Sequence, residues 1–230
     1  MDKIYTYRGG LDFSSEPHRI AVSKVLHHDV LLNTVQLWGQ SYYHFLCEIL
    51  PKLAVVMPLL VRFPDCKVLI PSIPRLKEFL DIAGFQNHDR FVTYDEGQNY
   101  AYSARALLLP RATLTGMPSR TALKALRRLV FKKIDQLDVV VLIRRQKGRA
   151  RALNDHDRVL YALRDSFPQF KVIEFLGSES VGATRDLFAR AAVIVGPHGA
   201  GFANILFRYS KSMHSVDLGL RTLLLVHEMR

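Results

Sequence analysis

An uninterrupted apolar run, Val139–Ile143, restricts the fold of this chain more than any other segment. A strand with one face in water alternates apolar and polar residues, whereas this run presents apolar side chains to both faces. Such runs are typical of strands in the centre of a parallel sheet that is covered by helices on both sides. The run therefore predicts an α/β fold.

Strand and helix patterns alternate along most of the chain, which favours βα units and doubly wound parallel sheets. A turn-rich passage at 113–119 divides this pattern, so we expect two Rossmann-like halves, at 1–115 and 116–230, facing each other across a cleft. A single sheet with all strands in series is the alternative. The predicted strands are 30–37, 67–70, 105–109, 139–143, 171–175 and 192–195, with 213–218 and 222–226 closing the pattern; the predicted helices are 41–61, 75–83, 120–133, 154–166, 182–191 and a segment that starts at 202.

The predicted helix 41–61 contains Pro51, which should kink or divide it. No apolar run approaches the length of about eighteen residues that a membrane span needs, so we expect no such span in this chain. The two cysteines, Cys47 and Cys66, are interpreted as small core residues at least as readily as halves of a disulfide.

Positive charge is concentrated in one segment. The chain carries a formal net charge of +11, and 118–151 holds eleven Lys and Arg residues against only Asp135 and Asp138. An excess of this kind favours acidic partners such as nucleotides, nucleic acid or anionic membranes.

A glycine-rich loop follows the predicted strand 192–195. Glycines let backbone N–H groups approach an anion closely, and a helix that starts at Phe202 would direct its positive N-terminal end to the same point. The loop lacks the Gly-Lys-Ser/Thr ending of a P-loop and the third glycine of the dinucleotide fingerprint. We interpret it as an anion-binding loop, and a simple tight turn with a buried histidine is the alternative. Its candidate binding residues are Pro197, His198, Gly199, Ala200, Gly201 and Asn204.

Five cations lie within residues 144–151, directly after the apolar strand. Arg144 and Arg145 are closest to the strand end, where a guanidinium can grip a diphosphate with two hydrogen bonds, whereas Arg149 and Arg151 are interpreted as a solvated face. The carboxyl ends of parallel strands share one edge of a sheet, which places Arg144 and Arg145 beside the glycine loop. Nucleic-acid binding is disfavoured because no aromatic residue lies among these cations.

His44 and Glu48 are spaced i, i+4 on the predicted helix 41–61, so they share one face and can form a hydrogen bond. A carboxylate that orients an imidazole is one way to make a general base, and a purely structural pair is the alternative. No His-Glu-x-x-His spacing or cysteine-histidine cluster indicates a metal site.

Taken together, three landmarks resemble glycosyltransferase family 61. They are Tyr43-His44 with Glu48-Ile49-Leu50-Pro51-Lys52-Leu53, then Ile143-Arg144-Arg145, and finally Gly196-Pro197-His198-Gly199-Ala200-Gly201 with Asn204. The resemblance implies a GT-B-like fold and an inverting, metal-independent glycosyltransferase without a cofactor. Its co-substrate would be a nucleotide sugar, most simply a UDP-sugar, and its acceptor a glycan or glycoprotein, in the Golgi or endoplasmic reticulum lumen for eukaryotic members and in the cytoplasm for bacterial ones.

The resemblance also implies roles for individual residues. Arg144, Arg145 and the loop 197–201 would neutralise the departing diphosphate. His44 would deprotonate the acceptor hydroxyl with Glu48 orienting it, or Glu48 would itself be the base. Asp217 lies where an acidic strand residue that meets a ribose hydroxyl is common in the family. A full catalytic region of the family would extend beyond Arg230, so an inactive fragment or binding module of the same fold is an alternative to an enzyme.

Overall fold

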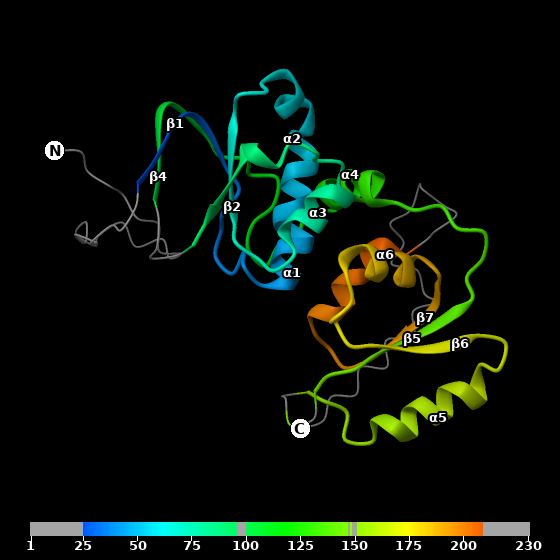
Figure 1. The fold of residues 1–230 in the computed structure, drawn as a ribbon. Coiled ribbons are helices and arrows are strands. Elements are labelled where there is room, and N and C mark those ends of the chain that lie inside the picture. Colours follow the sequence, from blue (N-terminus) through cyan, green and yellow to red (C-terminus); the bar gives the residue numbers. More distant parts are fainter. Residues whose placement is uncertain (1–24, 96–99, 147, 149–150, 209–230) are drawn as a thin grey trace. The chain divides into compact units, whose positions relative to one another are not determined.

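The computed structural model describes residues 25–95, 100–146, 148 and 151–208. The chain forms two compact units, one of Met1–Leu76 with Gln86–Leu123 and one of Lys77–Phe85 with Lys124–Arg230 (Figure 1). Each unit contains its own sheet, and every strand pair in both sheets is parallel. The predicted α/β fold with two parallel sheets is therefore confirmed, while the facing arrangement of a GT-B fold stays a prediction.

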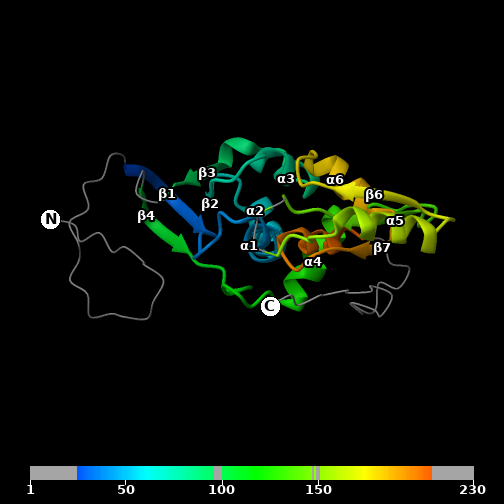
Figure 2. The same cartoon turned by 90° about the horizontal axis from the view of Figure 1, so that it is seen from below.

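The first unit is built on a sheet of four strands in the spatial order β3-β2-β1-β4 (Figure 2). The chain runs outward from β1 to β3 and then returns to the other side of β1 as β4, so the strand order reverses between β1 and β4. Ligands of open parallel sheets bind beyond the carboxyl ends of the strands at such a reversal. The strands are β1 (Val25–Asn33), β2 (Lys67–Pro71), β3 (Phe91–Tyr94) and β4 (Tyr100–Leu108).

The main helix of the first unit has three consecutive parts. They are α1 (Tyr42–His44), the π-helical turn η1 (Phe45–Ile49) and α2 (Leu50–Arg62). Pro51 lies in the first turn of α2 and has no N–H to donate to the preceding turn. The helix is wider in the turn before Pro51, where the N–H of Leu50 bonds to the carbonyl of Phe45 five residues earlier. The predicted division of the helix near Pro51 is thus confirmed.

The stretch Tyr42–Arg62 corrects the expectation that no segment resembles a membrane span. Its 21 residues are long and apolar enough to cross a membrane by length and composition alone. Single polar residues within it, such as Glu48 and Lys52, interrupted the apolar run in the sequence. In the structure, every residue from 45 to 54 is buried in the protein, which is the environment of a core helix.

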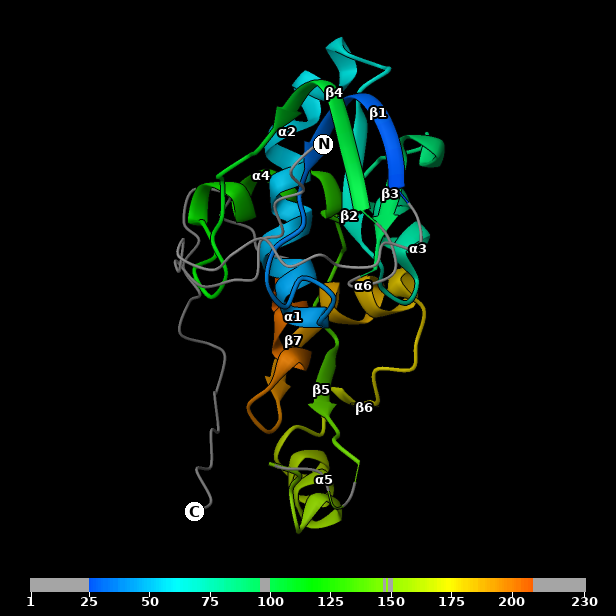
Figure 3. The same cartoon turned by 90° about the vertical axis from the view of Figure 1, so that its left-hand side faces the viewer.

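The second unit is built on a sheet of three strands in the order β6-β5-β7, with α5 on one face and α6 on the other (Figures 1 and 3). The apolar run of β5 is buried along its whole length, because its alternate side chains contact the two layers of helices. The elements are α3 (Leu76–Ile82), α4 (Arg120–Val130), whose first residues belong to the first unit, β5 (Val139–Ile143), α5 (His156–Ser166), β6 (Lys171–Phe175), α6 (Val181–Ala189), β7 (Ala191–Val195) and the 3₁₀-helix η3 (Ala200–Phe207).

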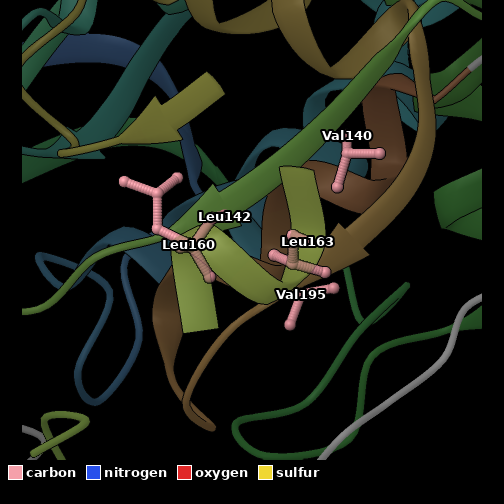
Figure 4. Close-up of a cluster of buried hydrophobic side chains, with 5 residues drawn as sticks. All are labelled: Val140, Leu142, Leu160, Leu163 and Val195. Atoms are coloured by element: carbon pink, nitrogen blue, oxygen red, sulfur yellow. The ribbon is translucent and has the colours of Figure 1, made fainter. Parts of the chain in front are cut away.

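Two apolar clusters hold this sheet between its helices. Leu160 and Leu163 of α5 pack against strand residues on one face (Figure 4). On α6, Phe188 makes an edge-to-face contact with Phe175 of β6, with ring centroids 5.0 Å apart. The cluster on the α5 side consists of Val140, Leu142, Leu160, Leu163 and Val195.

The predicted and observed elements differ in a few places. The strand β3 was not predicted, and the first strand begins at Val25 instead of residue 30. The helix after the glycine loop begins at Ala200 and is a 3₁₀-helix, two residues earlier than predicted. The predicted strands 213–218 and 222–226 lie outside the described residues. Cys47 and Cys66 are both buried free thiols, as the interpretation as core residues requires.

Candidate functional site

The first unit contains a buried carboxylate, Glu48, whose side chain is fully enclosed. Its Oε1 atom accepts hydrogen bonds from the backbone N–H of Gly116 at 2.9 Å and from Nδ1 of His44 at 3.0 Å. Its Oε2 atom accepts a hydrogen bond from Nε2 of Gln36. A buried charge is tolerated only when such partners replace water, so this network both stabilises the carboxylate and fixes its orientation.

Three segments meet at this carboxylate. Gln36 follows β1, Gly116 lies in the turn after β4, and Glu48 belongs to the π-helical turn η1. The network thus lies beyond the carboxyl ends of β1 and β4, where the strand order of the sheet reverses. Thr113, also after β4, donates from Oγ1 to the backbone carbonyl of Glu48 at 2.8 Å.

The hydrogen bonds of Glu48 determine which nitrogen of His44 can act as a base. A carboxylate oxygen only accepts, so Nδ1 of His44 donates to Oε1 of Glu48. In the neutral imidazole Nε2 then has a free lone pair. The His44 side chain is 16% exposed. This arrangement can accept a proton from a hydroxyl group and hold the resulting charge next to a carboxylate.

Aromatic rings surround His44. The ring of Tyr43 meets it edge-on at 5.2 Å between centroids, and that of Trp38 is tilted against it at 5.4 Å. Burial raises the pKa of Tyr43, with the nearby Cys47 and Glu48 adding to the effect, so its phenol stays neutral near pH 7.

Lys52 continues the network away from His44. Its side chain is buried, and Nζ donates a hydrogen bond to Oε1 of Gln36. Gln36 therefore connects the cation of Lys52 to the carboxylate of Glu48. Burial lowers the pKa of Lys52 to about 8, although Glu48 acts in the opposite direction.

The second unit contains the glycine loop, which lies against the end of β5. A Cβ atom added to Gly196 would lie 2.6 Å from Cβ of Ile143, and one added to Gly201 would lie 2.9 Å from Cγ2 of the same residue. Only glycine permits this close approach. The loop follows β7, and β5 and β7 are the neighbours between which the strand order of this sheet reverses, so this site also lies at a switch point.

The arginines after β5 differ in what they contact. The guanidinium of Arg145 lies over Gly199, where an added Cβ would be 2.9 Å from Cζ. Arg151 contacts Nδ1 of His198 in the loop. Arg144 instead pairs with Glu174 at 3.1 Å, and Glu174 also bonds to Nε2 of His156 at 2.7 Å. The structure thus brings Arg145 and Arg151 to the loop, while Arg144 is engaged at β6.

The remaining loop residues have distinct environments. Pro197 is buried, His198 is exposed, and Gly199, Ala200 and Gly201 are partly exposed. Asn204 is fully buried, and its Nδ2 donates to the carbonyl of Gly201 at 3.0 Å, which closes the first turn of η3. Asp217 lies outside the described residues. Among the residues that the structure describes, no group of three or more His, Cys, Asp or Glu side chains could hold a metal ion.

The comparison with protein families decides the relationship of this chain. A family model described as Glycosyltransferase 61 matches residues 42–215, a range that includes His44, Glu48 and the glycine loop. The chain belongs to glycosyltransferase family 61. No curated protein matches it.

The search of solved structures finds a similar glycosyltransferase for this family 61 member. It is the bacterial iron-containing dodecameric glycosyltransferase TibC from enterotoxigenic E. coli H10407, with 11% sequence identity and a TM-score of 0.32. The alignment covers 75% of this chain and 54% of TibC, so this chain spans about half the length of that protein.

Sequence reasoning missed several residues of these sites. Gln36 follows β1 and Gly116 follows β4, so both are remote from Glu48 in sequence. No rule of residue spacing predicts a contact between segments that follow different strands. Arg151 was interpreted as part of a solvated face, but it reaches His198 from a backbone with a φ of +64°. Its spacing to Arg145 was not a signal, because spacing alone does not determine what two neighbouring arginines contact.

Proposed function

We propose that this family 61 member transfers a sugar from a nucleotide-diphosphate donor, a UDP-sugar, to a glycan or glycoprotein acceptor, with inversion and without a metal ion. The observation that carries the proposal is the buried, fully hydrogen-bonded Glu48 that holds Nδ1 of His44 and leaves Nε2 as a base. Family membership supports the same class of reaction.

His44 is the proposed general base, and Glu48 is the group that orients it. Glu48 has both oxygens occupied and its side chain is fully buried, whereas the ring of His44 is partly exposed. As Nε2 of His44 takes the proton of the acceptor hydroxyl, the oxygen attacks the anomeric carbon. The bond from that carbon to the diphosphate oxygen breaks, its electron pair leaves with the nucleotide diphosphate, and a single displacement of this kind inverts the anomeric configuration.

The second unit is the proposed donor site. The leaving diphosphate gains negative charge in the transition state, and fixed cations and backbone N–H groups stabilise such charge without a metal. Arg145 lies at the glycine loop, and Arg151 adds a second cation at His198. Arg144 pairs with Glu174. As the neighbour of Arg145 in the sequence, it also adds positive charge to the electric field at the proposed donor site. Asn204 acts indirectly by holding the loop, and Asp217 is the proposed partner of a ribose hydroxyl.

Two measurements test the proposal. Calorimetric titration with UDP should give saturable binding, and a screen of nucleotide sugars that monitors nucleotide release should give turnover with at least one donor. Binding of UDP without turnover of any donor would favour the inactive binding module of the same fold. Absence of binding by UDP and by the other nucleoside diphosphates would rule out the proposed donor site.

Nucleic-acid binding through the basic segment 118–151 predicts different behaviour. Retention on DNA would be strongly salt-dependent and would not change in His44 or His198 variants. UDP would not compete with the DNA in that case.

A further inference from the structure

Trp38 is the one tryptophan of the chain, and its side chain is 62% exposed. It lies in the turn between β1 and α1, and its ring is tilted against that of His44 at 5.4 Å between centroids. This exposed indole is distinguished from other exposed apolar residues by its position beside the candidate base.

The backbone at Trp38 adds a second observation. Its φ of +59° lies in the left-handed region, which a bulky residue rarely adopts and which costs of the order of 1 kcal/mol or more. The turn is fixed on both sides: the N–H of Gly39 bonds to the carbonyl of Gln36 at 3.0 Å, and the N–H of Ser41 bonds to the carbonyl of Trp38 at 2.9 Å. A glycine would fit this conformation without strain, so the tryptophan carries a backbone cost that a glycine would not.

A neighbouring turn carries two exposed apolar side chains. Leu114 and Met117 close a turn through two backbone hydrogen bonds, and both side chains are more than half exposed. Thr115 in this turn donates from Oγ1 to the carbonyl of Leu37 at 3.3 Å, which ties it to the turn of Trp38. Since Gly116 of the same turn bonds to Glu48, both turns are anchored to the network that orients His44.

We propose that Trp38 is the platform on which a pyranose ring of the acceptor stacks, so that the acceptor hydroxyl belongs to a sugar and not to a serine, a threonine or a lipid. The inference rests on the proposed function and specifies its acceptor. One face of a pyranose is formed by C–H groups and packs on a flat aromatic surface, while its hydroxyls project from the rim. A ring stacked on the indole therefore presents hydroxyls near His44, whose ring centroid lies 5.4 Å from that of Trp38.

The first test uses the fluorescence of the protein, because Trp38 supplies all of its indole emission. Titration with xylotriose, cellotriose and chitotriose should change the emission saturably for at least one sugar, and a serine-containing peptide should not. No donor is needed, so a response without sugar transfer would keep the acceptor site and reject the enzyme. Absence of a response to all three sugars, in a protein that transfers sugar to a peptide, would overturn the inference.

The second test separates binding from structure. Trp38→Ala should raise the acceptor KM about 10- to 100-fold, as loss of an aromatic anchor does, and Trp38→Phe should restore most of it. Tyr161→Ala removes an equally exposed aromatic residue from α5 and should leave KM unchanged.

Trp38→Gly provides the sharpest outcome. Glycine accepts a φ of +59°, so Tm should rise while the acceptor KM worsens as in Trp38→Ala. A fall in Tm would instead assign a structural role to the indole. An unchanged acceptor KM in both variants of an active enzyme would overturn the inference while leaving the proposed function intact.

Discussion

The two candidate sites occupy equivalent positions in their sheets but consist of different kinds of chemical groups. In the first unit, the site beyond β1 and β4 consists of buried side chains, with Glu48 and Lys52 linked by Gln36. In the second unit, the site beyond β5 and β7 consists of a backbone loop and arginines that remain at least partly exposed. Both lie where the order of the strands reverses.

The difference corresponds to two chemical tasks. A general base must hold one lone pair in one direction, which requires a fixed ring and therefore a buried, fully bonded network. A diphosphate has many equivalent acceptor oxygens, so long cations around a close-fitting backbone loop can bind it without a rigid arrangement. Substitutions in the first unit should therefore have larger effects than those in the second.

The largest effect is expected from His44→Ala. Loss of a general base typically lowers kcat about 10²- to 10⁴-fold, and the Kd for UDP should stay within about twofold of the wild-type value. Initial rates of nucleotide release and calorimetric titration measure the two quantities. His27→Ala, which removes an exposed histidine from β1, is the matched control and should retain full activity. Full activity of His44→Ala would contradict the role of the first unit.

The buried cation gives the next effect, which appears as a pH dependence of stability. Lys52 has a pKa of about 8 in the folded protein, below its ordinary value of 10.5, because burial disfavours its charge. Between these pH values the unfolded chain binds the proton and the folded protein does not, so stability rises with pH. The free energy of unfolding of the wild type minus that of Lys52→Met should increase by at most about 3 kcal/mol from pH 8 to 10.5.

Urea unfolding across this pH range measures the difference. The Lys52→Met variant is its own control, since all other titrating groups are shared and cancel. If the unfolding free energies of the two proteins changed with pH in parallel, the ammonium of Lys52 would be solvated. Lys52 would then not belong to the buried network of Glu48 and Gln36.

In the second unit, Arg145→Ala should weaken UDP binding about 10- to 100-fold, because it removes a charge-assisted hydrogen-bond donor at the loop. Arg144→Ala should weaken it about threefold or less, since that side chain is half-exposed and paired with Glu174. Arg158→Ala removes the same charge from the exposed surface of α5 and is the control. Equal losses for Arg144→Ala and Arg145→Ala would show that net charge, and not position at the loop, binds the donor.

Local patterns predicted much of this molecule. The apolar run Val139–Ile143 is the central strand of its sheet, and β6 has the predicted bounds, because burial on both faces leaves a clear signal in the sequence. The spacing of His44 and Glu48 predicted their hydrogen bond, since neighbours on a helix need no knowledge of the fold. The short edge strand β3 was missed because its four residues are only partly buried.

Contacts between remote segments were not predictable in the same way. Gln36 and Gly116 reach Glu48 only because β1 and β4 are neighbours in the sheet, and the sequence does not encode strand order locally. The exposure and strained backbone of Trp38 likewise depend on how its turn is fixed between β1 and α1. Arginine partners were the least predictable, since long side chains select among several acceptors once the loops are in place.

The smallest effect is expected at an exposed ion pair of the second unit, in contrast to the buried charges of the first. Asp138 precedes β5 and accepts two hydrogen bonds from Arg190, one of them from Nε at 2.8 Å, which lowers the pKa of its carboxyl. Because both side chains are partly exposed, Asp138→Asn should cost less than about 1 kcal/mol of unfolding free energy at pH 7. The contribution is fully present above the unfolded pKa of 3.8 and disappears as the pH falls through the lowered folded value. The urea unfolding curves of wild type and variant should therefore begin to converge near pH 3.8 and coincide only below the folded pKa. A loss of several kcal/mol at pH 7 would show that this exposed pair is as important to its unit as the buried network of Glu48 is to the first, and the distinction between the two units would fail.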